Sequence, residues 1–186
     1  MKRFYALVVA AAVMFSLAAC DGAQEMIDTT EGRLTETEFI SGVGNPWTEV
    51  ETVGEAAEGS GVGEFTLPED GSETSQGEIH WFGYSYMNEI AEATGSIGSA
   101  NLMVRKGLSE QGGDISGDFT DYEYEWTQDV DGLTVNCYGN EEGSAMLATW
   151  AKDGCSYCFM IRGQGDVYET YGLEQEAVTE MVSSVN

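Results

Sequence analysis

Two pairs of segments with alternating side chains, each joined by an Asp-Gly dipeptide, constrain the fold most. Over 122–130, large apolar residues mostly alternate with acidic ones, which is typical of a strand with one buried face. Asp-Gly at 131–132 is a strong hairpin turn, and the alternation resumes over 133–138. The turn places Trp126 opposite Cys137 on the apolar face of both strands, so turn and alternation predict the same antiparallel hairpin.

The second Asp-Gly dipeptide, at 153–154, predicts another hairpin by the same argument. It places Trp150 opposite Tyr157 and Ala148 opposite Phe159, again with apolar partners on one face.

Further strands are predicted upstream of these hairpins. The aromatic-rich segment 80–87 is typical of a strand, and 90–105 is expected to hold one more hairpin. Gly95 and Gly98 leave the register of that hairpin open.

Two helices are expected to frame the sheet. Thr52 and Glu55 have the spacing of a capping box that opens a short helix through Glu58, which Gly59 or Gly61 would end. The other helix is C-terminal, where apolar residues recur at helical spacing and predict packing on the sheet. These residues are Leu173, Ala177, Val178, Met181, Val182 and Val185.

The first twenty residues have the order of a secretory signal. Lys2 and Arg3 precede an apolar run over 6–15, and Leu-Ala-Ala-Cys closes the segment at 17–20. This ending resembles the lipobox of bacterial lipoproteins, so Cys20 is the predicted lipidation site, with palmitate among the expected acyl groups. A transmembrane anchor is disfavoured, because the run is shorter than the about 20 apolar residues that a membrane span needs. A cleaved signal without lipidation is the other alternative.

The sequence therefore divides into three parts: a cleaved lipoprotein signal peptide over 1–19, a flexible acidic tether over 20–44 and a single α+β domain over 45–186. We expect the domain to be an antiparallel sheet of five or six strands, with a short N-terminal helix and a C-terminal helix packed on one face. The expected location is the extracytoplasmic face of the cell membrane, held there by the lipid anchor.

The chain is strongly acidic. It has 7 Lys and Arg against 33 Asp and Glu, and losing Lys2 and Arg3 with the signal leaves a formal charge of −28. Nucleic acid is excluded as a partner, because phosphate binding needs clusters of Lys and Arg. The charge favours Ca²⁺, a basic peptide or a cationic envelope protein, with solubility as the simpler explanation.

Three cysteines remain beyond Cys20. Cys155 and Cys158 have C-x-x-C spacing, but on one strand they point to opposite faces about 10 Å apart, which is too far for a bridge. Free buried thiols are the first interpretation. A disulfide from Cys137 to either of the others, and a metal or redox site, stay open.

The segment 114–118, Asp-Ile-Ser-Gly-Asp, is the main candidate for a polar site. With one more acid close behind it, Asp114, Asp118 and Asp121 form a candidate Ca²⁺ site. Their spacing does not match an EF-hand loop. The alternative is that these side chains hydrogen-bond their own backbone in a turn, with Arg105 paired to one of them.

Catalytic motifs are scarce in the sequence. His80, the only histidine, lies on the aromatic-rich strand, and the chain has neither a G-x-S-x-G elbow nor the lysine of a P-loop. Whether the protein is an enzyme stays open, and a binding role is favoured.

Short motifs spread over 44–185 carry a family resemblance. They are Asn45-Pro46, Glu49-Val50, Glu55-Ala56-Ala57, Leu67-Pro68, Arg105-Lys106, Asp114 to Asp118, Tyr122, Val130 to Val135, Ala148-Thr149-Trp150 and Ser156-Tyr157. They resemble the domain-of-unknown-function family 4367, which occurs in lipoproteins and membrane-anchored envelope proteins of Gram-positive anaerobes. The resemblance implies an envelope location but no reaction, and Cys155 and Cys158 stand where that family usually has Ser or Tyr.

Two functions follow as hypotheses. The first is a non-enzymatic, lipid-anchored extracytoplasmic domain that binds or senses an unknown ligand. The alternative is a lipid or lipoprotein carrier with an apolar cavity between sheet and C-terminal helix. The residues expected to line that cavity are Tyr122, Tyr124, Trp126, Leu133 and Val135.

Overall fold

The pairing predicted by the Asp-Gly turns extends into one large antiparallel sheet. The computed structural model describes residues 45–109, 113–163 and 172–186. The elements are β1 (Thr48–Val50), α2 (Val53–Ser60), β2 (Glu73–Thr74), β3 (Gly77–Met87), β4 (Ile90–Ile97), β5 (Ala100–Leu108), β6 (Tyr124–Val130), β7 (Leu133–Gly139), β8 (Leu147–Lys152), β9 (Cys155–Arg162) and α3 (Gln175–Ser184).

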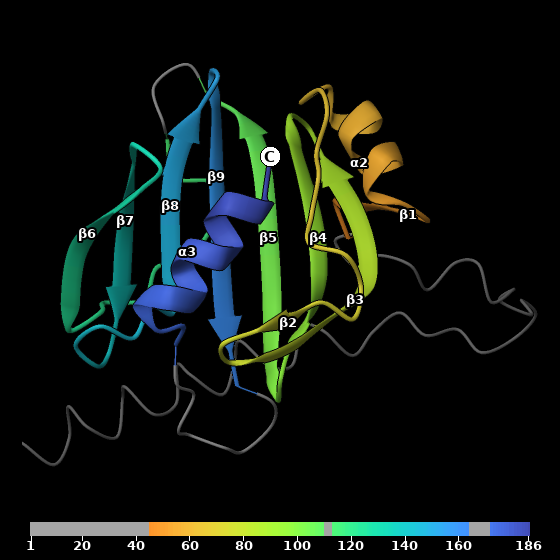
Figure 1. Cartoon of the computed structure of the whole chain (residues 1–186). Helices are drawn as coiled ribbons and strands as arrows, with labels where there is room; N and C mark the ends of the chain where they lie inside the picture. Colours follow the sequence, from red (N-terminus) through yellow and green to blue (C-terminus); the bar gives the residue numbers. More distant parts are fainter. Residues whose placement is uncertain (1–44, 110–112, 164–171) are drawn as a thin grey trace, which may run out of the picture. The chain divides into compact units, whose positions relative to one another are not determined.

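The strands lie in the order β1-β3-β4-β5-β9-β8-β7-β6, and β2 pairs with the start of β3, whereas β1 pairs with its end. Figure 1 shows β6 at one edge of the sheet and α3 crossing one face in front of β8, β9 and β5. The α+β class and the antiparallel sheet are confirmed. The expected number of five or six strands is wrong, because the sheet has nine. Two of them, β1 and β2, are too short to show alternation.

Both predicted hairpins form in the predicted register. Trp126 pairs with Cys137 in the first, and Trp150 pairs with Tyr157 in the second. Both residues of each turn have positive φ, 52° and 84° at 131–132. This is the conformation whose twist matches that of the flanking strands, and Asp-Gly adopts it readily.

Gly95 and Gly98, which left the register of the upstream hairpin open, are each required at their position for a different structural reason. A Cβ on Gly95 would lie 2.2 Å from the His80 carbonyl oxygen and 2.9 Å from the Trp81 ring, so the backbones of β3 and β4 approach where only glycine fits. The pairing shifts at this point, between Trp81 and Gly83. Gly98, with φ of 56°, lies in the turn from β4 to β5.

The helices differ from the prediction at their ends. The Thr52 side chain accepts a hydrogen bond from the Glu55 N–H at 3.2 Å, as a capping residue should. However, α2 continues past Glu58 to Ser60, and Gly61 ends it with φ of 76°. The C-terminal helix begins at Gln175, so Leu173, predicted inside it, lies before its first turn.

The hydrophobic core lies between the sheet and the two helices. Its α3 members are Ala177, Val178, Met181 and Val182, and α2 adds Ala56 and Ala57. Phe159 and Val135 face this side of the sheet and are fully buried. No helix in the described ranges is long and apolar enough to span a membrane.

Candidate functional site

The face of the sheet opposite α3 has an ion pair at its centre. Arg105 alternates along β5 with core residues and so points to this other face. Its Nε and Nη2 atoms both lie 2.7 Å from Glu92 Oε2, and the two side chains are only 15% and 12% exposed. The Arg105 Nη1 group donates to the carbonyls of Ile115 and Ser116, and the Trp47 ring lies 4.8 Å from the guanidinium carbon. Arg105 therefore holds the segment around Ile115 and Ser116, which leads to β6, against the sheet by hydrogen bonds.

The acids of this segment turn toward their own backbone. Asp114 Oδ1 accepts from the Ser116 N–H at 2.8 Å. Asp118 accepts from the Thr120 N–H and hydroxyl and, at 2.5 Å, from the Tyr122 hydroxyl. Burial opposes the loss of its proton, but these hydrogen bonds prevail and hold the pKa of Asp118 below its usual value.

Two of the three candidate calcium residues, Asp114 and Asp118, thus already accept hydrogen bonds. Asp121, the third of them, is exposed at the surface. Within the described ranges, no group of three His, Cys, Asp or Glu side chains is placed to hold a metal ion. Arg105 bonds the backbone of this segment and pairs with Glu92 rather than with Asp114 or Asp118. Calcium binding by Asp114, Asp118 and Asp121 stays a prediction.

The three cysteines past the tether are free and buried. Cys155 belongs to the hydrophobic core, where its Sγ lies 3.9 Å from the Val62 carbonyl oxygen, whereas Cys158 pairs in register with Arg105 and lies on the opposite face. Burial raises the pKa of Cys137 to about 11 and that of Cys158 to about 12. Both thiols are therefore protonated at neutral pH, which makes them poor nucleophiles.

His80 lies on β3 at the surface and is half exposed. Its ring nitrogens are 3.7 Å from Asp70 Oδ1 and 3.6 Å from Glu78 Oε1. The Asp70 oxygen already accepts from the Trp81 N–H at 2.8 Å. His80 thus adds positive charge beside two carboxylates when protonated.

The strand β6 has an open outer edge. Val130 and Leu133 flank the two-residue turn and pair with each other. Because hydrogen-bonded and outward-facing residues alternate along such a strand, Glu125, Thr127 and Asp129 direct their N–H and C=O groups away from β7. In the described part of the chain, no strand lies beyond β6.

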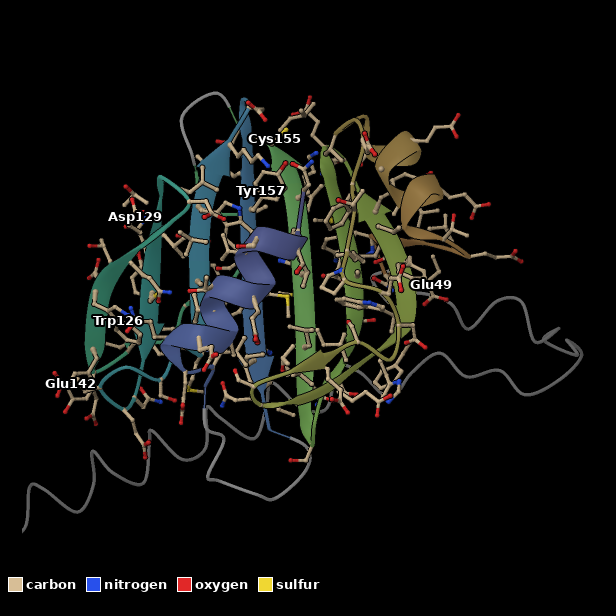
Figure 2. All side chains as sticks on the ribbon, viewed as in Figure 1. Glu49, Trp126, Asp129, Glu142, Cys155 and Tyr157 are labelled. Carbon is tan, nitrogen blue, oxygen red and sulfur yellow. The ribbon has the colours of Figure 1, made fainter. Side chains whose placement is uncertain are left out.

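Acidic side chains line this open edge, which we call the acidic edge and define as Glu123, Glu125, Asp129, Asp131 and Glu142. All five are exposed. Figure 2 shows Trp126, Asp129 and Glu142 on or beside β6, at the side of the sheet away from Glu49. The acidic edge therefore combines unpaired backbone groups with negative charge.

A groove of about 410 Å³ runs along the same strand. Tyr124, Trp126 and Gln128 of β6 line it together with Gln175. The Gln128 side chain is 7% exposed, and its Nε2 donates to the Gln175 carbonyl at 2.9 Å and to the Thr179 hydroxyl at 2.7 Å. Its Oε1 is buried and has no hydrogen-bond partner in the described part of the chain, so the groove wall holds an unused acceptor.

No protein-family model, no curated protein and no solved structure matches the chain. The resemblance to the domain-of-unknown-function family 4367 stays a prediction. The predicted signal over 1–19, the tether over 20–44 and the lipidation site Cys20 lie outside the described residues.

Proposed function

We propose that the chain is a lipid-anchored, extracytoplasmic binding domain of the bacterial cell envelope, non-enzymatic, that recognises a cationic partner. The observation that supports a cationic partner most is the acidic edge, where exposed carboxylates surround unpaired backbone groups of β6. The anchor rests on the signal-like N-terminus and on Cys20.

The charge of the mature chain, −28 without Lys2 and Arg3, agrees with this proposal. An acidic domain is repelled by anionic lipid headgroups. The predicted tether over 20–44 would give the anchored domain a reach of roughly 25–30 Å. An anchored domain of this kind would stand off the membrane and keep its acidic edge accessible to proteins of the envelope.

The carrier alternative has less support, because the residues expected to line its cavity do not line the pocket of about 620 Å³ beside α3, whose apolar walls include Pro68, Ile79 and Met181. Its cavity would lie against the sheet face under α3, but Val135 is fully buried there. The helix residues Val178 and Val182 belong to the same packed core. Tyr122, expected on that face, instead lies beside Tyr138 of β7, with ring centroids 6.2 Å apart.

Two measurements test the proposal on the full chain. Wild type expressed in a bacterium is expected in the membrane fraction with an acylated N-terminal cysteine by mass spectrometry, whereas Cys20→Ser is expected to lose both. Purified protein is then titrated with polylysine and with polyglutamate at low and high salt. We expect binding of polylysine alone, weakened by salt. Equal binding of both polymers, or of neither, would count against a cationic partner.

A further inference from the structure

We infer that the cationic partner is an extended basic peptide segment, which binds by adding a strand to β6. This inference rests on the proposed function and names the partner class for the same acidic edge. Strand addition needs an exposed strand with free backbone groups, and it draws affinity from the backbone and specificity from alternate side chains. The β6 edge offers free backbone groups for affinity and alternating side chains for specificity.

The backbone of β6 can pair with a whole peptide strand. Glu125, Thr127 and Asp129 each present one N–H and one C=O outward, at alternate positions of a seven-residue strand. A partner strand at the usual spacing would bond these groups without any rearrangement of the β6–β7 hairpin.

The side chains of β6 specify the pattern of that peptide. Glu125, Thr127 and Asp129 point to one face of the sheet, because they alternate with Trp126 and Gln128. Side chains directly opposite each other on paired strands lie about 4.5–5.5 Å apart at Cβ, which places Lys or Arg of the partner against the two carboxylates. The peptide should therefore carry basic residues on this face at two positions four residues apart, with the position between them opposite Thr127.

The other face of the added strand meets the groove. Tyr124 is 41% exposed and Trp126 is half-buried, so apolar side chains of the peptide would pack beside these rings. Gln128 Oε1 is a buried acceptor of the groove wall with no hydrogen-bond partner among the described residues. An alternating basic and apolar peptide fits both faces.

A second copy of the chain is a poorer occupant of the same edge. Pairing β6 with β6 would bring Glu125 and Asp129 of two molecules together, and like charges across paired strands are destabilising. The carboxylates that oppose self-pairing are the ones that attract a basic strand.

The test uses two synthetic peptides of equal composition. One alternates lysine with valine, and the other has its lysines and valines in separate blocks. We expect the full chain to bind the alternating peptide more tightly by calorimetry. Amide hydrogen exchange is expected to slow at Glu125, Thr127 and Asp129 in the complex. Equal affinity for both peptides would overturn strand addition while leaving a cationic partner in place, and no binding of either would remove the proposed function as well.

Matched variants separate backbone pairing from charge. Thr127→Pro removes an outward N–H that the fold does not use, whereas Thr127→Val keeps it. We expect the proline variant to fold, as its thermal midpoint will report, and to bind the alternating peptide about tenfold more weakly than the valine variant. Equal binding by the two variants would overturn the inference.

A second pair of variants controls for net charge. Glu125→Gln with Asp129→Asn removes two charges from the acidic edge, and Glu49→Gln with Glu58→Gln removes two from β1 and α2. Only the first pair should weaken binding. Equal weakening by both pairs would mean that the peptide is attracted by the net charge of the chain and not by the acidic edge. Sedimentation without peptide completes the test, because a dimer lost in Thr127→Pro would assign the edge to a second copy.

Discussion

The two edges of the sheet are finished in different ways. On the outer side of β3, the Ile79 N–H donates to the Ser72 carbonyl at 2.9 Å, and the Trp81 N–H donates to Asp70 Oδ1 at 2.8 Å. The three residues of β1 pair with the far end of the same strand. On the outer side of β6, the described chain supplies no such cover. The outer side of β3 is covered by local chain, up to the three-residue strand β1 at that end of the sheet, whereas the seven-residue β6 is protected by charge alone.

The difference matters because an open strand edge is a site for strand pairing with any other chain. Covering the edge removes the site for all partners. Acidic side chains remove it for acidic or neutral strands but leave it attractive to basic ones. The contrast between β3 and β6 is therefore a contrast between an edge that is closed and one that is selective.

The largest loss of stability is expected from substitution of Arg105. Its side chain links segments that lead to both edges of the sheet with the centre of the sheet. It contacts Trp47, just before β1, and the carbonyls of Ile115 and Ser116 on the way to β6. Arg105→Ala leaves Glu92 buried without its partner, so we expect a loss of about 3–5 kcal/mol in the free energy of unfolding. Urea unfolding measures it.

Arg105→Lys is the control for this change. It keeps the charge but loses the planar group that bonds Glu92 and two carbonyls together, so an intermediate loss is expected. A loss below about 1 kcal/mol for Arg105→Ala would mean that the ion pair contributes little and that neither edge depends on it.

The next effect compares the edges directly. Asp70→Ala removes the acceptor of the Trp81 N–H on the covered edge and should cost about 1 kcal/mol. Glu125→Ala on the open edge should change stability by no more than about 0.5 kcal/mol, because its side chain is exposed. Urea unfolding of both variants is the measurement. The reverse ranking would show that the open edge is structurally the more important one.

Much of the fold could be predicted because its strongest signals are local. An Asp-Gly turn and the alternation beside it determine a hairpin without reference to the rest of the chain, and both hairpins form in the predicted register. Other features depend on distant chain. Leu173 has the right spacing for α3, but its N–H and C=O bond Ala145 instead, so the helix starts later. The strands β1 and β2 exist only because the edge of β3 accepts them.

The candidate site was harder to predict for the same reason. Glu92 and Arg105 pair across β4 and β5, and this register is the one that Gly95 and Gly98 left open. The carbonyl groups that complete the arginine site carry no signal in the sequence. The alternation of β6 was visible, but its place at the edge depends on the order of strands, which turn chemistry does not encode.

A smaller loss of stability is expected when the pH is lowered and Asp118 becomes protonated. Because the hydrogen bonds from Thr120 and Tyr122 outweigh burial and lower the pKa of Asp118, the folded chain binds this proton less tightly than the unfolded chain. Asp118 therefore contributes stability above the ordinary carboxyl pKa of about 3.9, and the contribution is lost as the pH falls through the lower folded value. In Asp118→Asn this part of the pH dependence should vanish.

The comparison with wild type isolates that contribution from the many other carboxylates. The difference in unfolding free energy between wild type and Asp118→Asn should be largest near neutral pH and shrink below the ordinary carboxyl pKa. A difference that does not change with pH would mean that the Asp118 turn, which leads into β6, is not held by its charge.

The smallest expected effect is a difference in the rates of amide hydrogen exchange along β6 and β3, with no change in stability. Along β6, the amides of Glu125, Thr127 and Asp129 face outward and should exchange faster than those of Trp126 and Gln128, which bond β7. Along β3, no such regular alternation is expected, because the Ile79 and Trp81 N–H groups have acceptors on the outer side and Tyr84 to Tyr86 pair with β1. Hydrogen exchange followed by NMR at single residues measures both patterns. Uniform protection along β6 would show that something covers this edge in solution, and the edge would then be closed rather than selective.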